Sequence, residues 1–281
     1  MRFQVRKLAR IVAIVLIAGI ACALLARFSP GSTVDERELN QKAGEDTIAA
    51  LRAQRQVSIA TGFANYFRGL AKGDLGYSES NNAPVAALIA DRAPATLREL
   101  GIGLLGGWLV GLAFAIPAGR FARSSTYDAL SAAGAGVLLS LPAALIAYLC
   151  VLAGAAPAIV LMIVVAPRIF QFAKNLLREA YRAAHVETAR ARGVGESRIL
   201  WIHALPSAGP QLIALAAASV SIAIGAAIPV EAICDVPGLG RLAWQAAMAR
   251  DLPLLVNLTM LVAVATTSAA MLSEAAAERK S

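Results

Sequence analysis

Side chains that could perform chemistry are few in this sequence, and they concentrate between residues 168 and 206. Both histidines, His185 and His203, lie there, together with seven Lys or Arg and three Glu residues. Two histidines 18 residues apart lack the ligand spacing of a metal site and are typical of hydrogen-bonding surface residues. The sequence also lacks HExxH, GxSxG and P-loop motifs, and no GxGxxG follows an expected strand. We therefore predict no catalytic residue and no metal ligand.

The composition requires that a lipid bilayer form part of the solvent of this chain. Of its 281 residues, 58% are hydrophobic and 16% are charged, whereas about 25% are charged in soluble domains. Mean hydropathy is +0.64. The low aromatic content of 6% favours packed transmembrane helices over a β-barrel. The net charge of +8 then reflects cytoplasmic loops rather than a nucleic-acid partner.

Six apolar runs approach or exceed the length needed to cross a hydrocarbon core of about 30 Å. They cover residues 11–26, 100–118, 129–153, 155–172, 206–233 and 254–272, and Pro142 is expected to kink the third. We expect an N-terminal transmembrane helix at 1–26, an external segment at 27–99 and a five-helix domain at 100–281. An alternative for the first run is a cleaved signal peptide, for which Ala21-Cys22-Ala23 offers a site.

The charges predict the orientation of these spans. The stretch 168–206 carries seven basic and three acidic residues, whereas 27–99 carries nine of each. Because cytoplasmic loops carry the excess of Lys and Arg, we place 168–206 in the cytoplasm and 27–99 outside. Six spans then put the N-terminus and the C-terminus in the cytoplasm as well.

Two features within the spans bear on packing and on energy supply. Gly103, Gly107 and Gly111 repeat every four residues, which predicts one helix face where another backbone can approach closely. Acidic residues are nearly absent from the spans, and Glu231 is the main one. Proton relays normally need such residues, so an external ATPase is the favoured energy source. The three cysteines are scattered along the chain and predict no disulfide framework.

The stretch 168–206 is polar enough to leave the membrane. It predicts a helix at 178–192, a break at Gly193-Val194-Gly195, and a short helix from about Glu196 to Ala204 before Pro206. We expect this short helix to dock on a soluble partner. The side chains expected to fill its groove are Ile199, Leu200 and Ile202, with Glu196 and Arg198 at the rim. The alternative is a plain basic loop at the membrane surface.

These residues carry a resemblance to a family. Glu187-Thr188-Ala189, three residues, Gly193, nine residues and His203-Ala204-Leu205-Pro206 resemble the EAA loop of ABC importer permeases, within about 173–206. Thr188 replaces the family's Ala and His203 its Ile. Further similarities to the peptide/nickel (dipeptide/oligopeptide) subgroup follow in matching order. They are Gly73–Ser78, Arg92–Leu97, Ser140–Pro142, Val230-Glu231, Pro237–Arg241 and Ala249–Pro253.

The resemblance implies a six-helix permease of the type I ABC importer kind with a cytoplasmic coupling helix, in a bacterial inner membrane. It implies pairing with an identical or different permease, two ATPase subunits below, which bind ATP and Mg, and a substrate-binding protein above. This chain would bind no cofactor itself. Residues assigned to the ATPase-coupling loop are Glu187, Thr188, Ala189, Arg190, Gly193, Glu196, Arg198, Ile199, Leu200, Ile202, His203, Leu205 and Pro206. Residues assigned to an outer gate are Glu231, Pro237, Gly238, Gly240, Arg241, Arg250 and Asp251.

Three functions remain open from the sequence. The leading one is the permease subunit of an ATP-driven importer of peptides or a similar small solute. The second is the same fold importing nickel or a metal chelate, which would have to arrive complexed because the spans lack clustered His, Cys or Met. The third is a non-transporting membrane scaffold whose basic loop recruits a cytoplasmic partner. At Glu231, a gate and a purely structural cap or ion pair with Arg241 are both consistent with the sequence.

Overall fold

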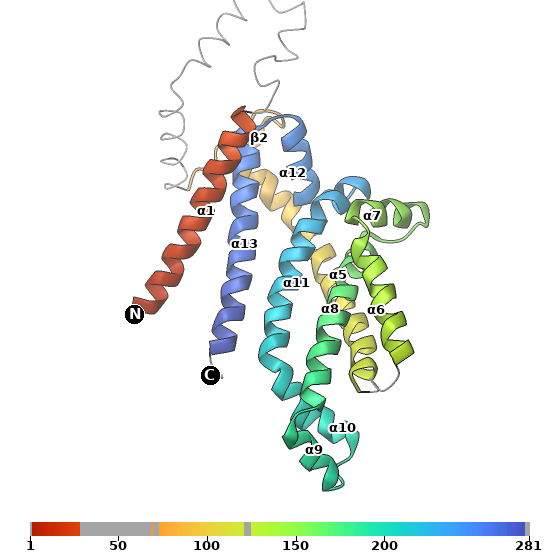
Figure 1. The fold of residues 1–281 in the computed structure, drawn as a ribbon. Coiled ribbons are helices and arrows are strands. Elements are labelled where there is room, and N and C mark those ends of the chain that lie inside the picture. The colour runs from red at the N-terminus through yellow and green to blue at the C-terminus, as the bar shows by residue number, and fades with distance from the viewer. Residues whose placement is uncertain (1, 29–68, 70–72, 121–124, 279–281) are drawn as a thin grey trace, which may run out of the picture.

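The computed structural model is built almost entirely of helices (Figure 1). It describes residues 2–28, 69, 73–120 and 125–278. The elements are α1 (Arg2–Phe28), β1 (Tyr77–Ser78), β2 (Ala83–Pro84), α5 (Val85–Arg120), α6 (Ser125–Ser140), α7 (Ala143–Leu152), α8 (Pro157–Tyr181), α9 (Ala184–Ala191), α10 (Glu196–Ile199), the π-helix η1 (Leu200–Ala204), α11 (Leu205–Ile233), α12 (Leu239–Met248) and α13 (Leu252–Glu278). The all-helical prediction is confirmed, apart from the antiparallel pair β1–β2.

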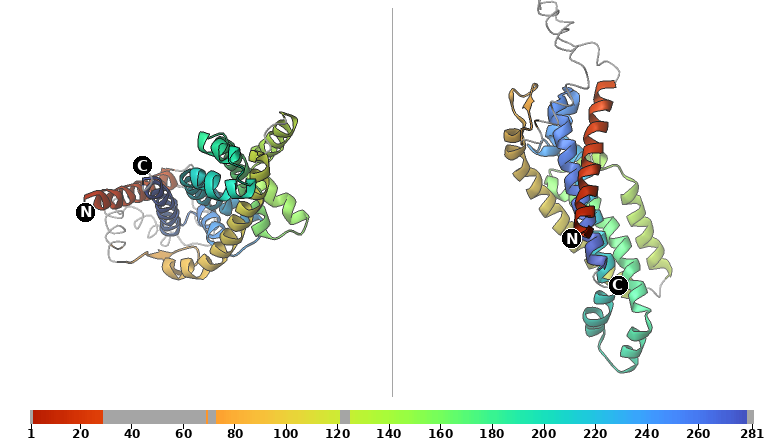
Figure 2. Two further views of the ribbon diagram at one scale, coloured as in Figure 1. Left: turned by 90° about the horizontal axis from the view of Figure 1, so that it is seen from below. Right: turned by 90° about the vertical axis from the view of Figure 1, so that its left-hand side faces the viewer.

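Four helices are long and apolar enough to cross a membrane. They are α5, α8, α13 and a continuous helix at Glu196–Ile233 that joins α10, η1 and α11. The bent pair α6 and α7 makes a fifth if it counts as one span, whereas the apolar part of α1, Ala9–Leu25, is shorter. Of the six predicted spans, four or five are thus supported by length and composition. The first helix, α1, packs alongside α13 (Figures 1 and 2).

The predicted kink at Pro142 is confirmed as a sharp break. Helix α6 ends at Ser140, α7 begins at Ala143, and the two axes differ by 92°. Pro142 is the N-cap of α7 with extended backbone angles, φ −60° and ψ 139°. Proline cannot donate the backbone hydrogen bond that would continue α6, so the chain turns here. Helix α7 therefore points away from the bundle (Figure 1).

Helix α5 begins earlier than predicted. The external segment was expected to run to Glu99, but α5 starts at Val85 and continues through Pro94. Val85 is fully buried in a small cluster with Leu242 of α12 and Leu254 of α13. This cluster packs the first part of α5 against α12 and α13. Contacts distant in sequence thus extend the helix beyond its apolar run. The remainder of the predicted external segment lies mostly outside the described residues.

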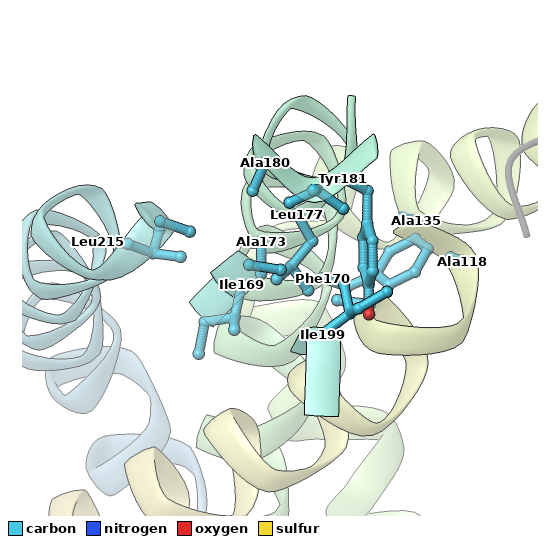
Figure 3. Close-up of a cluster of buried hydrophobic side chains, with 14 of the residues drawn as sticks. Ala118, Ala135, Ile169, Phe170, Ala173, Leu177, Ala180, Tyr181, Ile199 and Leu215 are labelled. Carbon is cyan, nitrogen blue, oxygen red and sulfur yellow. The ribbon is translucent and has the colours of Figure 1, made fainter. Parts of the chain in front are cut away.

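Two prolines, Pro157 and Pro167, lie within α8 without interrupting it. Pro157 occupies the first turn, where its missing N–H costs nothing, and Pro167 is accommodated inside the helix. Helix α8 extends to Tyr181, past the predicted end at Phe172. It forms the centre of the bundle, in contact with α5, α6, α7 and α11. Figure 3 shows the buried side chains that α8 contributes to the largest core cluster.

The repeated glycines of α5 lie against α8. A Cβ atom on Gly103 would stand 2.6 Å from Cβ of Leu161, and one on Gly111 would stand 2.7 Å from Cγ2 of Ile169. At Gly107 the nearest atom would be Cβ of Val165, at 3.4 Å. Small residues permit this close approach, which gives van der Waals contact where the hydrophobic effect cannot drive helix association.

Gly111→Ala is expected to destabilise the folded protein by about 1–3 kcal/mol, because the methyl group would overpack the α5–α8 contact. The matched control is Gly101→Ala on the same helix, where an added Cβ meets nothing within 4 Å. Thermal unfolding of the purified protein in detergent measures both. Equal melting temperatures for the two variants would contradict the close packing.

Functional residues occupy opposite ends of the bundle. Helices α9 and α10 project at one end, and the start of α1 and the end of α13 lie on that side of the molecule (Figure 1). The β1–β2 pair, α12 and α7 lie toward the other end (Figures 1 and 2). The first is the knob end of the bundle, and the second is the hairpin end.

Candidate functional site

The knob is formed by α9, α10 and η1. The predicted helix at 178–192 is two helices, because α8 ends at Tyr181 and α9 begins at Ala184. The predicted short helix at 196–204 exists, but it is not separate, because it continues through η1 into α11. Pro206 sits in the first turn of α11 and does not break the helix. The knob is therefore attached rigidly to a spanning helix rather than held between two breaks.

Gly193 closes helix α9 in a Schellman turn. Its φ is +78°, a left-handed conformation that glycine adopts without steric cost. The Gly193 N–H donates to the Arg190 carbonyl at 3.0 Å, and the Val194 N–H donates to the Ala189 carbonyl at 3.1 Å. These are the two hydrogen bonds that define this helix ending. The turn sends the chain back so that α10 packs against α9.

One ion pair and a buried face fix α10 against the rest of the knob. Arg190 Nε donates to Glu196 Oε1 at 2.8 Å across the Gly193 turn. Val186 and Ala189 of α9 and Ile199 of α10 are buried in the same core cluster. Figure 3 draws Ile199 with Leu177 and Tyr181 of α8 in this cluster. The knob is thus packed on the end of α8 through its own apolar side.

The prediction that Ile199 fills a groove on a partner is wrong, because its side chain is 0% exposed within this chain. Leu200 and Leu205 are partly buried against the same core. Ile202 is 53% exposed, and beside it Trp201 is 67% exposed. The sequence reading missed Trp201, although a tryptophan in a polar stretch was a signal for a contact surface.

Polar residues of the knob lie on the same outer surface as Trp201. Glu187, Thr188, Arg190 and Arg198 are exposed, as is Pro206 in the first turn of α11. The Thr188 hydroxyl donates back to the Ala184 carbonyl at 2.9 Å, so its hydrogen bond stays within α9. His203 lies beside His185, with ring centroids 6.1 Å apart. The knob offers a mixed apolar and basic surface.

At the hairpin end, Glu231 caps helix α12. Its carboxylate is 1% exposed, and Oε2 accepts hydrogen bonds from the backbone N–H groups of Gly240 at 2.7 Å and Arg241 at 3.2 Å. The Thr96 hydroxyl also bonds to Glu231 and accepts from the Leu239 N–H at 2.7 Å. An anionic group at a helix N-terminus satisfies amides that have no partner within the helix. This cap joins α5, α11 and α12.

The start of α12 requires glycine at two positions, the N-cap Gly238 and Gly240 in the first turn. A Cβ on Gly238 would collide with the carboxylate of Glu231, and one on Gly240 would stand 2.8 Å from the Ala227 carbonyl oxygen. The suggested ion pair between Glu231 and Arg241 is not formed, because the Arg241 guanidinium pairs with Asp235 at 2.6 Å. Pro237 precedes this turn and is exposed.

Asp251 ties the β1–β2 segment to the start of α13. Its buried Oδ2 accepts from the Ser78 hydroxyl at 2.6 Å and from the Ser80 hydroxyl and N–H at 2.7 and 3.0 Å. Nearby, Asn257 donates to the Leu75 carbonyl at 2.7 Å. Arg250 has a φ of +55°, which turns the chain between α12 and α13. Sequence analysis assigned no role to Ser78, Ser80 or Asn257.

Stability is expected to depend on Asp251 in a pH-dependent way. Burial acts to raise the pKa of this carboxyl, but the hydrogen bonds from Ser78 and Ser80 outweigh it and hold the pKa below the usual 3.8. Because the pKa of Asp251 is lower in the folded than in the unfolded protein, ionised Asp251 adds to the free energy of unfolding. This stabilisation is complete above the unfolded-state pKa and is lost as the pH falls through the folded-state pKa. Asp251→Asn should lower the melting temperature above about pH 5, with the difference vanishing in acid. The control is Glu79→Gln, an exposed neighbour; a pH-independent difference for Asp251→Asn would contradict the prediction.

Known proteins are similar to most of the chain. A peptide permease protein of Brucella suis biovar 1 is 26% identical over 271 residues, covering 85% of each chain. A peptide ABC transporter permease protein of Sinorhizobium fredii is 22% identical over 288 residues, covering 92% of this chain and 91% of that one. The inward-facing MetNI methionine ABC transporter has a chain of similar fold, with a TM-score of 0.59, 21% identity, and coverage of 68% of this chain and 97% of its own.

The family assignment rests on the larger part of the chain. Residues 108–278 match the family described as binding-protein-dependent transport system inner membrane component. The matched segment includes α8, the knob, the Glu231 cap and α13. Members are non-catalytic, multi-pass subunits of the inner membrane that work with ATPase and substrate-binding partners. The chain belongs to this family and is a permease component of a binding-protein-dependent ABC transporter.

Proposed function

We propose that this permease forms half of a translocation path for peptides or a similar small solute, and that the knob couples the path to ATP hydrolysis. The continuous helix Glu196–Ile233 carries the proposal. It begins inside the knob and ends two residues after the Glu231 cap, so any movement of the knob is delivered to the hairpin end. A helix of this length rises about 1.5 Å per residue and reaches across a membrane.

The knob has the properties needed to bind an ATPase subunit. Its inner side is fixed to α8 through Ile199, while Trp201, Ile202 and Arg198 remain exposed. Aromatic and arginine side chains dominate the energy of many protein interfaces. We place the ATPase contact on this exposed surface and on the exposed side of α9, including Glu187 and Thr188. In the proposed contact with the ATPase, Trp201 takes the place that the sequence predicted for Ile199.

The basic charge of residues 168–206, which include the knob, supports the predicted orientation. With the knob in the cytoplasm, the start of α1 and the end of α13 also lie on the cytoplasmic side (Figure 1). The β1–β2 pair and α12 then lie outside. We count α1 as the sixth span, because its apolar part, Ala9–Leu25, reaches the lower end of the range of about 17–25 residues that spanning helices use. The substrate-binding protein then docks at the hairpin end, where the Glu231 cap and the Pro237–Arg241 turn form the outer gate.

Peptide is the proposed cargo because both Brucella and Sinorhizobium relatives carry peptide permease names. A di/tripeptide permease of Pseudomonas aeruginosa adds 32% identity over 107 residues, 38% of this chain. The second permease of the complex is a copy of this chain or a related one. Two ATPases, one below each permease, hold ATP and Mg, and this chain holds neither.

Uptake by the reconstituted complex tests the cargo. The chain and the partners that co-purify with it are placed in liposomes with the substrate-binding protein, and accumulation of a labelled tripeptide is measured with ATP inside. We expect ATP-dependent accumulation that unlabelled peptide abolishes. ATP-dependent accumulation of a nickel chelate without peptide uptake would favour the metal importer instead. A complex that accumulates neither cargo while a control importer works would favour the scaffold.

A further inference from the structure

Arg168 is a charged side chain within a spanning helix. The six apolar runs of the sequence contain one basic residue, Arg168, and one acidic residue, Glu231. Glu231 lies at the hairpin end, where it caps α12. Arg168 lies near the middle of α8, which runs from the hairpin end of the bundle to the knob (Figure 1). Its charge therefore lies inside the membrane, before the part of the stretch 168–206 that reaches the cytoplasm.

The depth of Arg168 follows from the packing of α5 on α8. The apolar run of α5 ends at Ala118. A Cβ atom on Gly119 would stand 3.4 Å from the Lys174 carbonyl oxygen, so Lys174 is level with the end of this run. Arg168 precedes Lys174 by six residues of α8, which places it about 9 Å further into the hydrocarbon core. Side chains of a helix lean toward its N-terminus, so Arg168 leans away from the cytoplasmic interface.

Arg168 faces away from the rest of this chain. It is exposed, and within the described residues it has no hydrogen bond or ion pair. Phe172, Asn175 and Glu179 are also exposed and follow it on the same helix face, at spacings of four, three and four residues. The spanning helices that pack on α8 leave this face uncovered. Because a charged side chain at membrane depth faces water or a partner rather than lipid, this face borders a water-filled space or another chain.

A second copy of this chain would not neutralise Arg168. Glu231 is the one acidic residue of the six apolar runs, and it lies at the hairpin end. A paired copy therefore brings no carboxylate to the depth of Arg168, but it brings a second Arg168. Two like charges repel each other, so such a pair needs water or an anion between them. Arginines around a path attract anions and exclude cations.

We propose that Arg168 lines the translocation path and binds the carboxylate of a peptide as it passes. A linear peptide carries an anionic group at its C-terminus, and a guanidinium can hold a carboxylate with two parallel hydrogen bonds. Positive charge in the path works against a free divalent cation such as Ni²⁺, so the site favours peptide over metal ion as cargo. This role rests on the proposed function, which supplies the path and the peptide.

Two substitutions at Arg168 test this role in the reconstituted complex. Accumulation of a labelled tripeptide is measured for wild type, Arg168→Lys and Arg168→Gln, with the substrate-binding protein and ATP. We expect Arg168→Gln to lower uptake about tenfold or more, because it removes the charge. Arg168→Lys keeps the charge without the two-pronged geometry, so its uptake should stay within about threefold of wild type. Melting temperature and binding-protein-stimulated ATP hydrolysis should remain at wild-type values in both variants, because Arg168 makes no bond within the described residues that the changes would remove.

The same tripeptide with a C-terminal amide separates a carboxylate site from a general effect on the path. Arg168→Gln should lower uptake of the amide far less than uptake of the free peptide. The binding protein is common to all variants, so its own preference cancels in this comparison. Where the binding protein rejects the amide, the comparison of lysine with glutamine decides.

Three results would each overturn the carboxylate site. They are equal losses for free and amidated peptide in Arg168→Gln, equal losses for Arg168→Lys and Arg168→Gln, and loss of the second permease from the purified Arg168→Gln complex. The last result would assign Arg168 to the contact between permeases. A wild type that accumulates no peptide would instead contradict the proposed function itself, and the Arg168 site with it.

Discussion

Gly193→Asp should reduce ATP-dependent uptake about tenfold or more while the permease remains in the membrane at normal abundance. Gly193 has a φ of +78°, and a side chain in this conformation costs about 1–2 kcal/mol. An energy of that size shifts an equilibrium about tenfold, so the population of knobs in which α10 has left α9 rises by about that factor. A Cβ at this position meets nothing within 4 Å in this chain. The aspartate therefore extends outward, where it adds negative charge to the surface proposed to meet the ATPase.

The control for this variant is Gly195→Ala in the same turn. Gly195 has an ordinary φ of −62°, and an added Cβ likewise meets nothing within 4 Å. We expect Gly195→Ala to transport at close to the wild-type rate. Uptake and membrane abundance are measured for both variants in parallel, with ATP hydrolysis measured in the purified complex. Normal uptake by Gly193→Asp at matched abundance would contradict the coupling role of the turn.

The second large effect is expected at Glu231. Glu231→Ala removes the acceptor for the Gly240 and Arg241 amides. The Gly240 N–H is buried, and leaving it without a partner costs about 1–3 kcal/mol. Helix α12 should then detach from α11, with a lower melting temperature and a loss of uptake. Glu231→Gln keeps an oxygen for these amides, so the protein should remain folded. We expect this variant to lose uptake while binding-protein-stimulated ATP hydrolysis persists, because the gate is uncoupled and the knob is intact.

An exposed carboxylate of the hairpin end serves as the control for Glu231. Glu79 lies between Ser78 and Ser80 and is exposed, so Glu79→Gln should leave both uptake and stability unchanged. Wild-type uptake by Glu231→Gln would assign Glu231 a purely structural role as the cap of α12. Loss of both uptake and ATP hydrolysis in Glu231→Gln would likewise contradict a gate that acts separately from coupling.

Local chemistry explains which parts of the fold were predictable. The apolar runs predicted the spanning helices because a helix must be apolar along its length to lie in the hydrocarbon core. Pro142 predicted the break because proline lacks an N–H donor. The start of α5 was not predictable from its own residues. Val85 is buried by Leu242 and Leu254, whose positions are known only once α12 and α13 are folded. Similarly, Pro206 suggested a break after the short helix, but the fold accommodates it in a first helical turn.

The site was predictable in its segments but not in its contacts. The order of the Gly73–Ser78 and Ala249–Pro253 segments was visible in the sequence, yet 173 residues separate Ser78 from Asp251, and no periodicity links them. Thr96 and Glu231 are likewise brought together only by the packing of α5 on α11. In the knob, Ile199, Leu200 and Ile202 were predicted to contact a partner, but the sequence could not decide whether each faces α8 or a partner. Ile199 is buried within this chain, so its side chain faces α8 rather than a partner.

The central claim is that the knob couples this permease to an ATPase. Purification of the wild-type chain and of Gly193→Asp from the native host in mild detergent, with identification of the co-purifying proteins, tests it most directly. We predict that an ATPase and a second permease accompany the wild type, and that Gly193→Asp retains the second permease but loses the ATPase. Absence of any ATPase with the wild type, under conditions that keep a control transporter intact, would contradict the claim.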